Sequence, residues 1–311
     1  MRSERDGMEY FLGVDAGGTK AELVLGDATR ELGRVRTGTI KRMKADAATA
    51  EKNLAEGLRQ LQAQTRIAAE SITRCCIGTA GETVPLVTNW LREAFARHVG
   101  GELLILGDVE IALDSAFFGK RGVLVLAGTG SNVAGRAATG EIFRAGGWGP
   151  ALADQGSGHF IGLESLRRGF LAIDEQRETR VLDEAQRFWE LGSRAELIEY
   201  ANANPAPEYS RLTPLVVNLA EQGDTVARAV LEQGGVDLAY LAGLVIERVR
   251  GIEGERAFAV PAVAVAGSIL ERVAAVRGAM TSALRKRYPE IEVLEQPADP
   301  PAGALWAARN A

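Results

Sequence analysis

A pattern that occurs twice constrains this chain most: an apolar strand runs into a glycine-rich turn, and further short strands follow. The two turns begin near Gly17 and Gly128. Segments 14–35 and 125–145 match in the order of strand and turn, although few of their residues are identical. Because glycine has no Cβ, it permits tight turns and lets the backbone approach a ligand closely. The repetition therefore predicts an internal duplication, with one such turn in each copy.

Hydrophobic periodicity predicts the order βββαβαβα for the first copy. It places strands at 10–14, 21–25, 32–37, 72–77 and 102–106, and helices at 47–64, 89–98 and 109–118. The second copy restarts with strands at 123–126, 133–137 and 141–145. Helical periodicity, broken near 204–207 and 234–235, then extends from 158 to 250, before a strand at 260–266, a helix at 268–287, a strand at 291–295 and a helix at 303–310. The second copy is thus expected to carry a helical insertion.

The length of 311 residues favours two domains, because single hydrophobic cores rarely grow beyond roughly 250–300 residues. We expect residues 8–118, completed by the helix at 302–311, to form the first domain, and residues 119–301 the second. The chain contains neither a P-loop GxxxxGK[ST] nor a GxGxxG that opens a helix. The fold predicted is α/β, with two duplicated ribonuclease H-like (actin-like) domains, each built on a mixed five-stranded sheet.

Composition and charge disfavour several classes of partner and metal site. A formal net charge of -5 disfavours nucleic acid as the main partner. The longest apolar runs are too short to cross a bilayer, and residues 1–9 lack the apolar core of a signal peptide, so we expect a cytoplasmic protein without a membrane partner. The two adjacent cysteines, Cys75 and Cys76, suit buried thiols. With only two histidines, a divalent metal would need oxygen ligands.

The first glycine turn has the chemistry of a phosphate site. Gly17 and Gly18 leave backbone N–H groups accessible, and Thr19 adds a hydroxyl donor. Lys20 adds positive charge, and Asp15 can face a hydrated Mg²⁺ ion. A hairpin turn that merely needs glycine explains a single turn of this kind at least as well.

The second turn changes that balance. Gly128, Thr129, Gly130 and Ser131 follow an equally apolar strand in the apparent duplicate. Two such turns facing each other would clamp one polyphosphate between the domains. The pair therefore favours a nucleotide-binding protein over two unrelated hairpins.

Two aspartates are candidates for chemistry on a hydroxyl substrate. Asp108 ends an apolar strand and precedes a helix, which places it at the carboxyl edge of a sheet, where open α/β folds bind ligands. The residues alone leave a general base and a helix N-cap equally open there. Asp154 precedes another helix, where it suits hydrogen bonds from sugar hydroxyls, helix capping, or both. Asp114 lies inside an apolar helix and is the weaker candidate for the base.

Five stretches together resemble a known family. They are VDAGGTK, LGD at 106–108, AGTGSN at 127–132, GGWGPALADQGSG at 146–158 and VAGS at 265–268, in the same order and spacing. The chain is similar over almost its full length to the N-acetylglucosamine kinase branch of the BadF/BadG/BcrA/BcrD ATPases. That resemblance implies ATP and Mg²⁺ as cofactors and phosphoryl transfer to a small sugar substrate. The sugar implied is N-acetylglucosamine or a related amino sugar, with the 6-hydroxyl as acceptor.

The resemblance also implies roles for particular residues. It makes Asp108 the catalytic base. It places Gly147, Trp148, Gly149 and Asp154 at the sugar, and Gly267, Ser268 and Glu271 at the nucleoside. Trp148 is otherwise explained by core packing, and Gly267 and Ser268 by a tight strand-to-helix turn. A homodimer is implied as well.

The chain departs from the family pattern at the sugar site. Lys41 and Arg42 stand where relatives carry an asparagine, and Gln155 replaces a glutamate. The two cations suit either an acidic substrate or a solvated surface. Two rival functions share the fold. One is an activator ATPase of the 2-hydroxyacyl-CoA dehydratase type, which the adjacent cysteines fit poorly. The other is a non-catalytic sugar sensor, which could lose any of the residues Asp15, Thr19, Asp108 and Thr129 that this chain retains.

Overall fold

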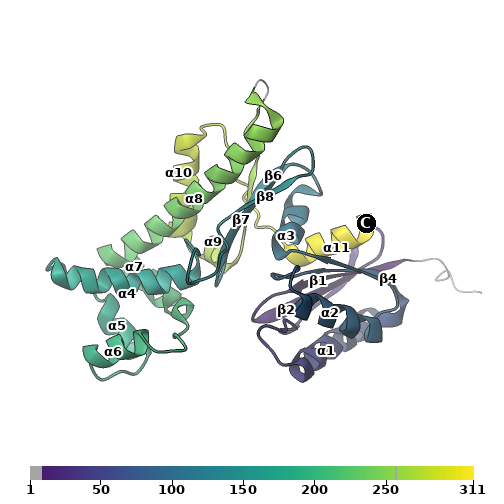
Figure 1. The fold of residues 1–311 in the computed structure, drawn as a ribbon, viewed down its shortest axis with the longest axis horizontal. Helices are drawn as coiled ribbons and strands as arrows, with labels where there is room; N and C mark the ends of the chain where they lie inside the picture. The colour runs from purple at the N-terminus through teal and green to yellow at the C-terminus, as the bar shows by residue number, and fades with distance from the viewer. Residues whose placement is uncertain (1–8, 256–257) are drawn as a thin grey trace, which may run out of the picture. The chain divides into compact units, whose positions relative to one another are not determined.

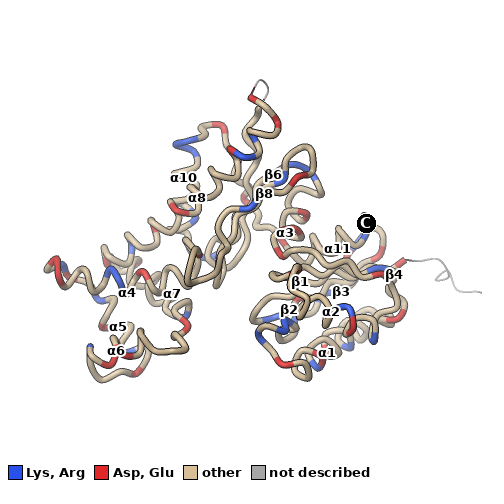
Figure 2. The backbone as a smooth tube through the Cα atoms, in the orientation of Figure 1, with Lys and Arg blue, Asp and Glu red and all other residues tan. Residues whose placement is uncertain are grey.

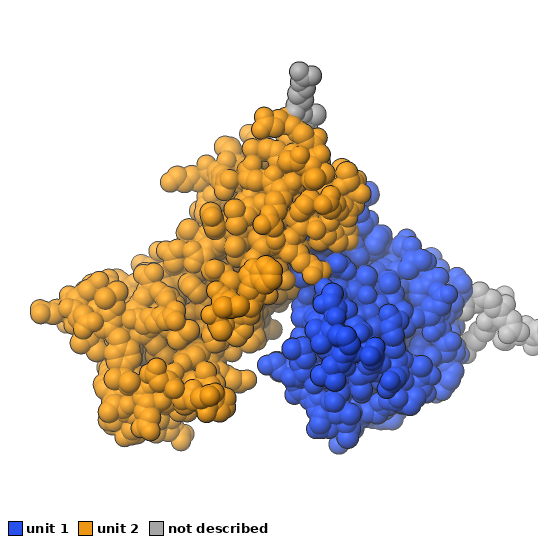
Figure 3. Space-filling view, viewed as in Figure 1, with its two compact units in different colours: residues 1–120, 298–311 blue, residues 121–297 orange. Residues whose placement is uncertain are grey.

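The computed structural model describes residues 9–255 and 258–311, which form a mixed α/β protein with two sheets. Two compact units can be distinguished (Figure 3): unit 1 comprises Met1–Lys120 and Ala298–Ala311, and unit 2 comprises Arg121–Pro297. Basic and acidic residues are interspersed along both units (Figure 2). The polar start, on which the signal-peptide argument depends, lies almost wholly outside the described residues.

Unit 1 contains a five-stranded sheet of order β3-β2-β1-β4-β5. Its strands are β1 (Tyr10–Ala16), β2 (Lys20–Gly26), β3 (Glu31–Gly38), β4 (Ile72–Gly78) and β5 (Glu102–Leu106). The first three form an antiparallel meander, whereas β4 pairs parallel to both β1 and β5. The carboxyl ends of β1, β4 and β5 therefore lie at one edge of the sheet.

Helices cover both faces of this sheet (Figure 1). They are α1 (Ala47–Thr65) and α2 (Pro85–His98) on one face, α3 (Asp108–Phe117) and α11 (Pro300–Asn310) on the other, with a short 3₁₀ turn η1 (Ala69–Ser71) before β4. Helix α2 begins four residues earlier than expected, because Pro85 suits the first helical position. A Cβ at Gly13 would lie 2.3 Å from the Leu305 amide nitrogen, so glycine permits α11 to contact β1 through its backbone.

Unit 2 contains a four-stranded sheet of order β8-β7-β6-β9. Its strands are β6 (Gly122–Ala127), β7 (Ser131–Arg136), β8 (Ile142–Ala145) and β9 (Val263–Ala266). The fifth strand expected at 291–295 is wrong: only an isolated bridge joins Val263 to Val293. The carbonyls of Leu294 and Glu295 instead accept hydrogen bonds from the Arg277 guanidinium, at 3.0 and 2.8 Å. An arginine thus replaces a strand partner there.

The insertion of unit 2 is helical, as expected. It comprises α4 (Gly158–Asp174), α5 (Val181–Phe188), α6 (Arg194–Ala201), η2 (Tyr209–Leu212), α7 (Thr213–Glu221) and α8 (Thr225–Glu253); α9 (Ser268–Arg272) and α10 (Ala274–Arg287) follow β9. The break expected at 204–207 lies between α6 and η2, but the break expected at Gly234 and Gly235 is wrong, since α8 runs through both. A Cβ at Gly235 would lie 2.3 Å from the Val276 oxygen, so this glycine serves the contact with α10. The single helix expected over 268–287 is divided at Val273.

Helix α8 is long and apolar enough to cross a membrane by length and composition. However, 61% of its apolar window is buried inside the structure, as in the core helix of a folded domain.

The two cysteines are buried on opposite faces of β4, Cys75 towards α2 and Cys76 towards α11, which confirms that they are core thiols.

Candidate active site

The carboxyl edge of the unit 1 sheet brings two aspartates together. Asp15 is near the end of β1, and Asp108 follows β5 as the first residue of α3. Gly107 occupies the N-cap position, and its N–H donates to Glu110 Oε2 at 3.2 Å. Asp108 Oδ1 accepts from the Val109 N–H at 2.9 Å. The cap of α3 is therefore built by Gly107 and Glu110, and the N-cap alternative for Asp108 does not hold.

Asp15 has an unusual acidity. Burial, and then the negative charge of Asp108, raise the pKa of Asp15 from 3.8 to about 7. A cation at this edge would offset both effects, since it would neutralise two carboxylates that now repel each other. Oxygen ligands suit Mg²⁺, which keeps several of its waters and needs only one or two protein carboxylates beside substrate phosphates. Asp15, beside the negative charge of Asp108, therefore fits a hydrated Mg²⁺ ion carried in with a nucleotide.

Thr79, which sequence reasoning missed, links the two strand ends. It directly follows β4 and is fully buried. Its N–H donates to the Leu106 oxygen at 3.0 Å, and its hydroxyl donates to the Ala16 oxygen at 3.4 Å. Through its backbone N–H and its hydroxyl, this residue links the ends of β5 and β1, which carry Asp108 and Asp15. A threonine after a predicted strand carries no sequence signal that would distinguish this role.

The first glycine turn is open. The hydroxyl of Thr39 donates to the Gly17 oxygen at 2.7 Å. A Cβ at Gly17 would lie 2.9 Å from the Lys20 oxygen, whereas at Gly18 it would meet nothing nearer than Lys44 Cγ at 3.9 Å. Only Gly17 therefore requires glycine for steric reasons. Gly18 and Thr19 are exposed, and the Lys20 ammonium pairs with Glu22 at 3.2 Å, on the surface of the sheet.

The two cations near this turn differ. The Arg42 guanidinium donates to the Ala45 oxygen at 2.6 Å and so closes its own loop. Lys41 is half-buried, and its burial lowers the pKa of the ammonium group, while the charges of Asp108 and Asp15 oppose that change. Lys41 is thus electrostatically part of the carboxylate edge rather than a fully solvated charge.

The second glycine turn, in unit 2, is held tightly against the start of α4. The N–H groups of Gly158 and His159 donate to the oxygens of Gly128 and Thr129, at 2.8 and 3.2 Å. The Ser131 N–H donates to an Asp154 carboxylate oxygen at 2.6 Å, and the Ser131 hydroxyl donates to the Gln155 oxygen at 2.7 Å. We refer to these four hydrogen bonds as the α4 joint.

Asp154 is buried beside this turn, with 9% of its surface exposed. Burial raises the pKa of its carboxyl group, and hydrogen bonds from Ser131 and Ser157 oppose the shift. Ser157 is the N-cap of α4, with its hydroxyl accepting from the Phe160 N–H at 3.0 Å, so capping does not explain Asp154. The ring of His159 packs edge-on against Tyr209, as expected for a packing residue.

The segment of the predicted sugar loop before Asp154 is exposed and rich in glycine. Gly147 has φ of +71°, and a Cβ there would lie 2.8 Å from the Asn132 amide group, so this position requires glycine. Gly149 also has a positive φ, of +91°. Trp148, between them, is 74% exposed, so core packing does not explain it.

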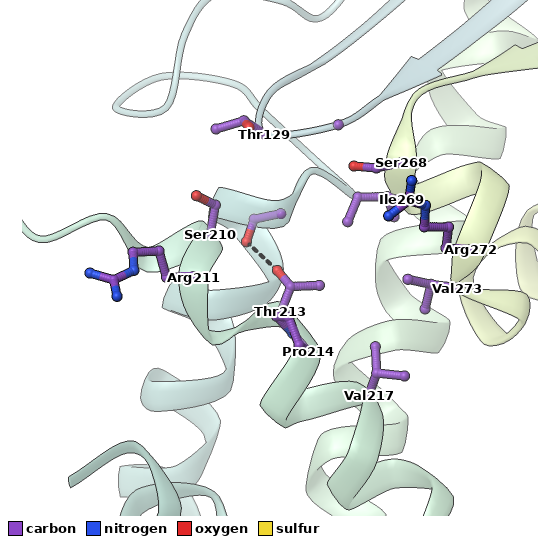
Figure 4. Close-up of a pocket in the computed structure, with 12 residues that line it drawn as sticks. Thr129, Ser210, Arg211, Thr213, Pro214, Val217, Ser268, Ile269, Arg272 and Val273 are labelled. Carbon is purple, nitrogen blue, oxygen red and sulfur yellow. Dashed lines mark hydrogen bonds between the residues drawn. The ribbon is translucent and has the colours of Figure 1, made fainter. Parts of the chain in front are cut away.

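A cavity of ≈ 440 Å³ adjoins the second turn (Figure 4). Its lining comes from the turn, α4, the η2–α7 segment and α9: Gly128, Thr129, Gly158, Ser210, Arg211, Thr213, Pro214, Val217, Ser268, Ile269, Arg272 and Val273. The walls combine apolar side chains with hydroxyl groups and two arginines, Arg211 and Arg272, which suits a planar base carrying a polar sugar and phosphates.

Two predicted nucleoside residues adjoin this cavity in different ways. Ser268 lines it. Gly267 has φ of +91°, and a Cβ there would lie 2.4 Å from the Ala127 oxygen, so this glycine lets the β9–α9 turn contact the second glycine turn. Glu271 is not among the lining residues, and its carboxylate accepts from the Gly267 N–H at 3.0 Å. Arg272, its neighbour, lines the cavity and was missed.

Comparisons with known proteins show what this chain is similar to. The model of the BadF/BadG/BcrA/BcrD ATPase family matches residues 12–311. An N-acetyl-D-glucosamine kinase of Dictyostelium discoideum is 30% identical, over 97% of this chain and 98% of that protein. An N-acetylmuramic acid/N-acetylglucosamine kinase of Clostridium acetobutylicum is 26% identical, over 97% and 99%. A crystal structure from Chromobacterium violaceum, provisionally named an N-acetylglucosamine kinase, has a TM-score of 0.75 at 24% identity, over 96% and 98%.

Proposed function

The chain belongs to the BadF/BadG/BcrA/BcrD ATPase family, and from that premise we propose that it is an ATP-dependent kinase of an amino sugar. The family prediction made from the five sequence stretches is thereby confirmed. The relatives from Dictyostelium discoideum and Clostridium acetobutylicum are both named as kinases of N-acetylated amino sugars, and each aligns with nearly all of this chain. N-acetylglucosamine or a close relative is accordingly the substrate we propose.

The observation that carries the proposal is the pair of carboxylates at the edge of the unit 1 sheet. Asp108 lies at the N-terminus of α3, outside the N-cap position, and its charge helps to raise the pKa of Asp15 to about 7. A sugar hydroxyl is a weak nucleophile, and a carboxylate positioned to accept its proton makes in-line attack on a γ-phosphoryl group possible. We assign that role to Asp108.

The remaining residues bind and orient. We assign the backbone amides around Gly17, Gly18 and Thr19 to the phosphates, as the open turn allows. Asp15 would hold Mg²⁺ through water, and the ion would neutralise charge on the phosphates. Asp108, when ionised, keeps its acceptor oxygens for the hydroxyl that reacts.

In unit 2, the ≈ 440 Å³ cavity is the proposed nucleoside site, with Ser268 and Arg272 on its wall. Turn residues Gly128, Thr129, Gly130 and Ser131 are proposed to contact phosphates through the atoms that the α4 joint leaves available. We place the sugar at Asp154 and at the glycine-rich segment around Trp148. Phosphorylation at the 6-hydroxyl, a cytoplasmic location and a homodimer are further parts of the proposal.

The test is ADP release from Mg·ATP over a panel of sugars: N-acetylglucosamine, N-acetylmuramic acid, glucosamine and glucose. We expect the fastest release with an N-acetylated amino sugar, and loss of release in Asp108→Asn. Glu93→Gln, which changes an exposed carboxylate of α2, is the matched control and should keep the wild-type rate. Equal rates for Asp108→Asn and the wild type would refute the assignment. Sugar binding without any ADP release would instead support a sensor, and an iron–sulfur absorbance would support an activator.

A further inference from the structure

The first turn of α4 separates two cavities of unit 2. Gly158, its first residue, lines the ≈ 440 Å³ nucleoside cavity. His159, the next residue, lines a second cavity of ≈ 180 Å³ together with Asp154 and Gln155. Two consecutive residues of one helical turn therefore line the cavities proposed for the nucleotide and for the sugar. Because only one helical turn separates the two cavities, a ligand bound in one cavity can affect the residues that line the other.

The α4 joint makes this turn and the second glycine turn a single body. The first N–H groups of a helix lack partners within the helix. Here the groups of Gly158 and His159 donate to carbonyls of the glycine turn, and the Phe160 N–H donates to the Ser157 hydroxyl. The start of α4 is thus not a vacant anion site. Its amides fix the direction of the Gly128 and Thr129 carbonyls instead.

Asp154 completes the joint from the sugar side. Its carboxylate accepts the Ser131 N–H at 2.6 Å, and a Cβ at Gly130 would lie 3.2 Å from the same oxygen. The carboxylate therefore lies directly against the turn, with little space to move towards it. A carboxylate has two oxygens and about four acceptor positions, so one oxygen can hold the turn while the group still accepts from a sugar hydroxyl.

We propose that Asp154 is a positioning residue that couples the two substrates: sugar bound at Asp154 fixes the second glycine turn and so tightens nucleotide binding. This inference rests on the proposed kinase function and on the placement of the sugar at Asp154. A ligand that orders a segment lowers the ordering cost for the next ligand, which gives positive cooperativity without a change of fold. The coupling is reciprocal, so nucleotide must tighten sugar binding by the same factor.

The experiment is calorimetry of the intact protein with Mg²⁺ and a non-hydrolysable ATP analogue, with and without saturating N-acetylglucosamine. The coupling ratio is the analogue Kd without sugar divided by the Kd with sugar. For the wild type we expect a ratio of about 5 or more, at the lower end of the usual range for coupled sites. In Asp154→Asn, the ratio should fall towards 1, while the Kd measured without sugar stays within about threefold of the wild type.

Two further variants separate this role from simple sugar binding. Ser131→Ala removes the hydroxyl bond to Gln155 but keeps the backbone N–H bond to Asp154 and leaves the carboxylate for the sugar, so it should lower the ratio in part without changing the sugar Kd measured alone. Should Asp154→Asn not fold, Ser131→Ala carries the test. Asp174→Asn changes an exposed carboxylate at the other end of α4 and should keep the wild-type ratio.

The outcomes are distinct. If N-acetylglucosamine neither binds nor is phosphorylated, it is not the substrate, and the proposed substrate is refuted. The ADP-release assay with the panel of sugars then shows whether another sugar is phosphorylated. If both ligands bind the wild type but the ratio is 1, the function stands and the coupling is refuted. A wild-type ratio in both Asp154→Asn and Ser131→Ala would show that the α4 joint does not carry the coupling.

Discussion

The two glycine turns follow similar apolar strands, yet they are supported very differently. The turn after β1 is exposed, and one side-chain hydrogen bond, from Thr39, holds its Gly17 carbonyl. The turn after β6 is held by the four hydrogen bonds of the α4 joint. The first turn adjoins the carboxylates proposed for chemistry, and the second adjoins the proposed binding cavities. Two similar strand–turn elements can thus keep the same order of strand and turn while the hydrogen bonds that support them differ.

The largest expected effect contrasts the aspartates of the two units. Asp108→Asn should lower kcat by about 10²–10⁴-fold with little change in the sugar KM, because it removes an interaction of the transition state alone. Asp154→Asn should mainly raise the sugar KM, with a smaller loss of kcat. Steady-state ADP release at varied sugar measures both. Equal patterns of kcat and KM in the two variants would remove the proposed division of roles.

The next effect concerns the acidity of Asp15. At pH values below 3.8 the carboxyl is protonated in both folded and unfolded chains. Between about pH 4 and pH 7 the unfolded chain loses the proton and the folded chain retains it, so the wild type loses stability as pH rises. Because a shift of one pKa unit is worth about 1.36 kcal/mol, the loss relative to Asp15→Asn is at most about 4 kcal/mol.

Urea denaturation of the wild type and Asp15→Asn at a series of pH values checks this. The difference between their free energies of unfolding should grow to about pH 7 and stay constant above it. Parallel curves across that window would contradict the burial of an ionisable carboxyl at this edge. No such slope is expected for Glu93→Gln, because that side chain is exposed.

A smaller effect is expected from glycine-to-alanine substitutions, which add one methyl group to each turn. In Gly130→Ala the new Cβ would lie 3.2 Å from the Asp154 carboxylate, which must shift, so we expect a loss of about 1–2 kcal/mol in stability and weaker nucleotide binding. In Gly18→Ala the nearest atom is 3.9 Å away, and stability should change by less than about 0.5 kcal/mol. Thermal unfolding of both variants measures the two losses of stability. Equal losses would contradict the inference that the second turn is held more tightly than the first.

The smallest effect is expected at Lys20. Its ammonium pairs with Glu22 at 3.2 Å, with about half of the lysine side chain exposed. Exposed pairs contribute roughly 0–1 kcal/mol, so Lys20→Met should change the stability of the protein by no more than this. If Lys20 also contacts phosphate, the variant should raise the Kd of the ATP analogue, and the dependence of that Kd on salt should weaken. An unchanged Kd would confine Lys20 to the sheet surface.

Local patterns predicted most of unit 1, because its strands and helices follow simple periodicity and its turns carry glycine. The same reasoning failed at Gly234 and Gly235, where glycine serves close packing of α8 on α10 instead of a break. It failed again at 291–295, where the Arg277 side chain takes the carbonyls that a strand would pair. These outcomes depend on partners far away in the sequence, which a single chain read locally does not contain.

In the candidate site, too, local features could be predicted from the sequence, whereas features that depend on tertiary packing could not. Asp15, Asp108 and the glycine turns could be found, because strand ends and glycine are visible in the sequence. Thr79, Arg272 and the apolar wall of the nucleoside cavity could not, since each becomes part of the site only through tertiary packing. The cavity wall at Pro214 and Val217 comes from the insertion, more than eighty residues after the second turn. The placement of the predicted site residues around ligands stays a prediction.

The return of α11 to unit 1 has a consequence for biosynthesis. Residues 300–310 supply the helix that contacts β1 through its backbone at Gly13, yet the ribosome makes them only after all of unit 2. Domains usually fold in the order in which they are translated. Here the sheet of unit 1 keeps one apolar face uncovered by α11 while nearly two hundred further residues emerge, so the earliest-made unit is completed after the later one.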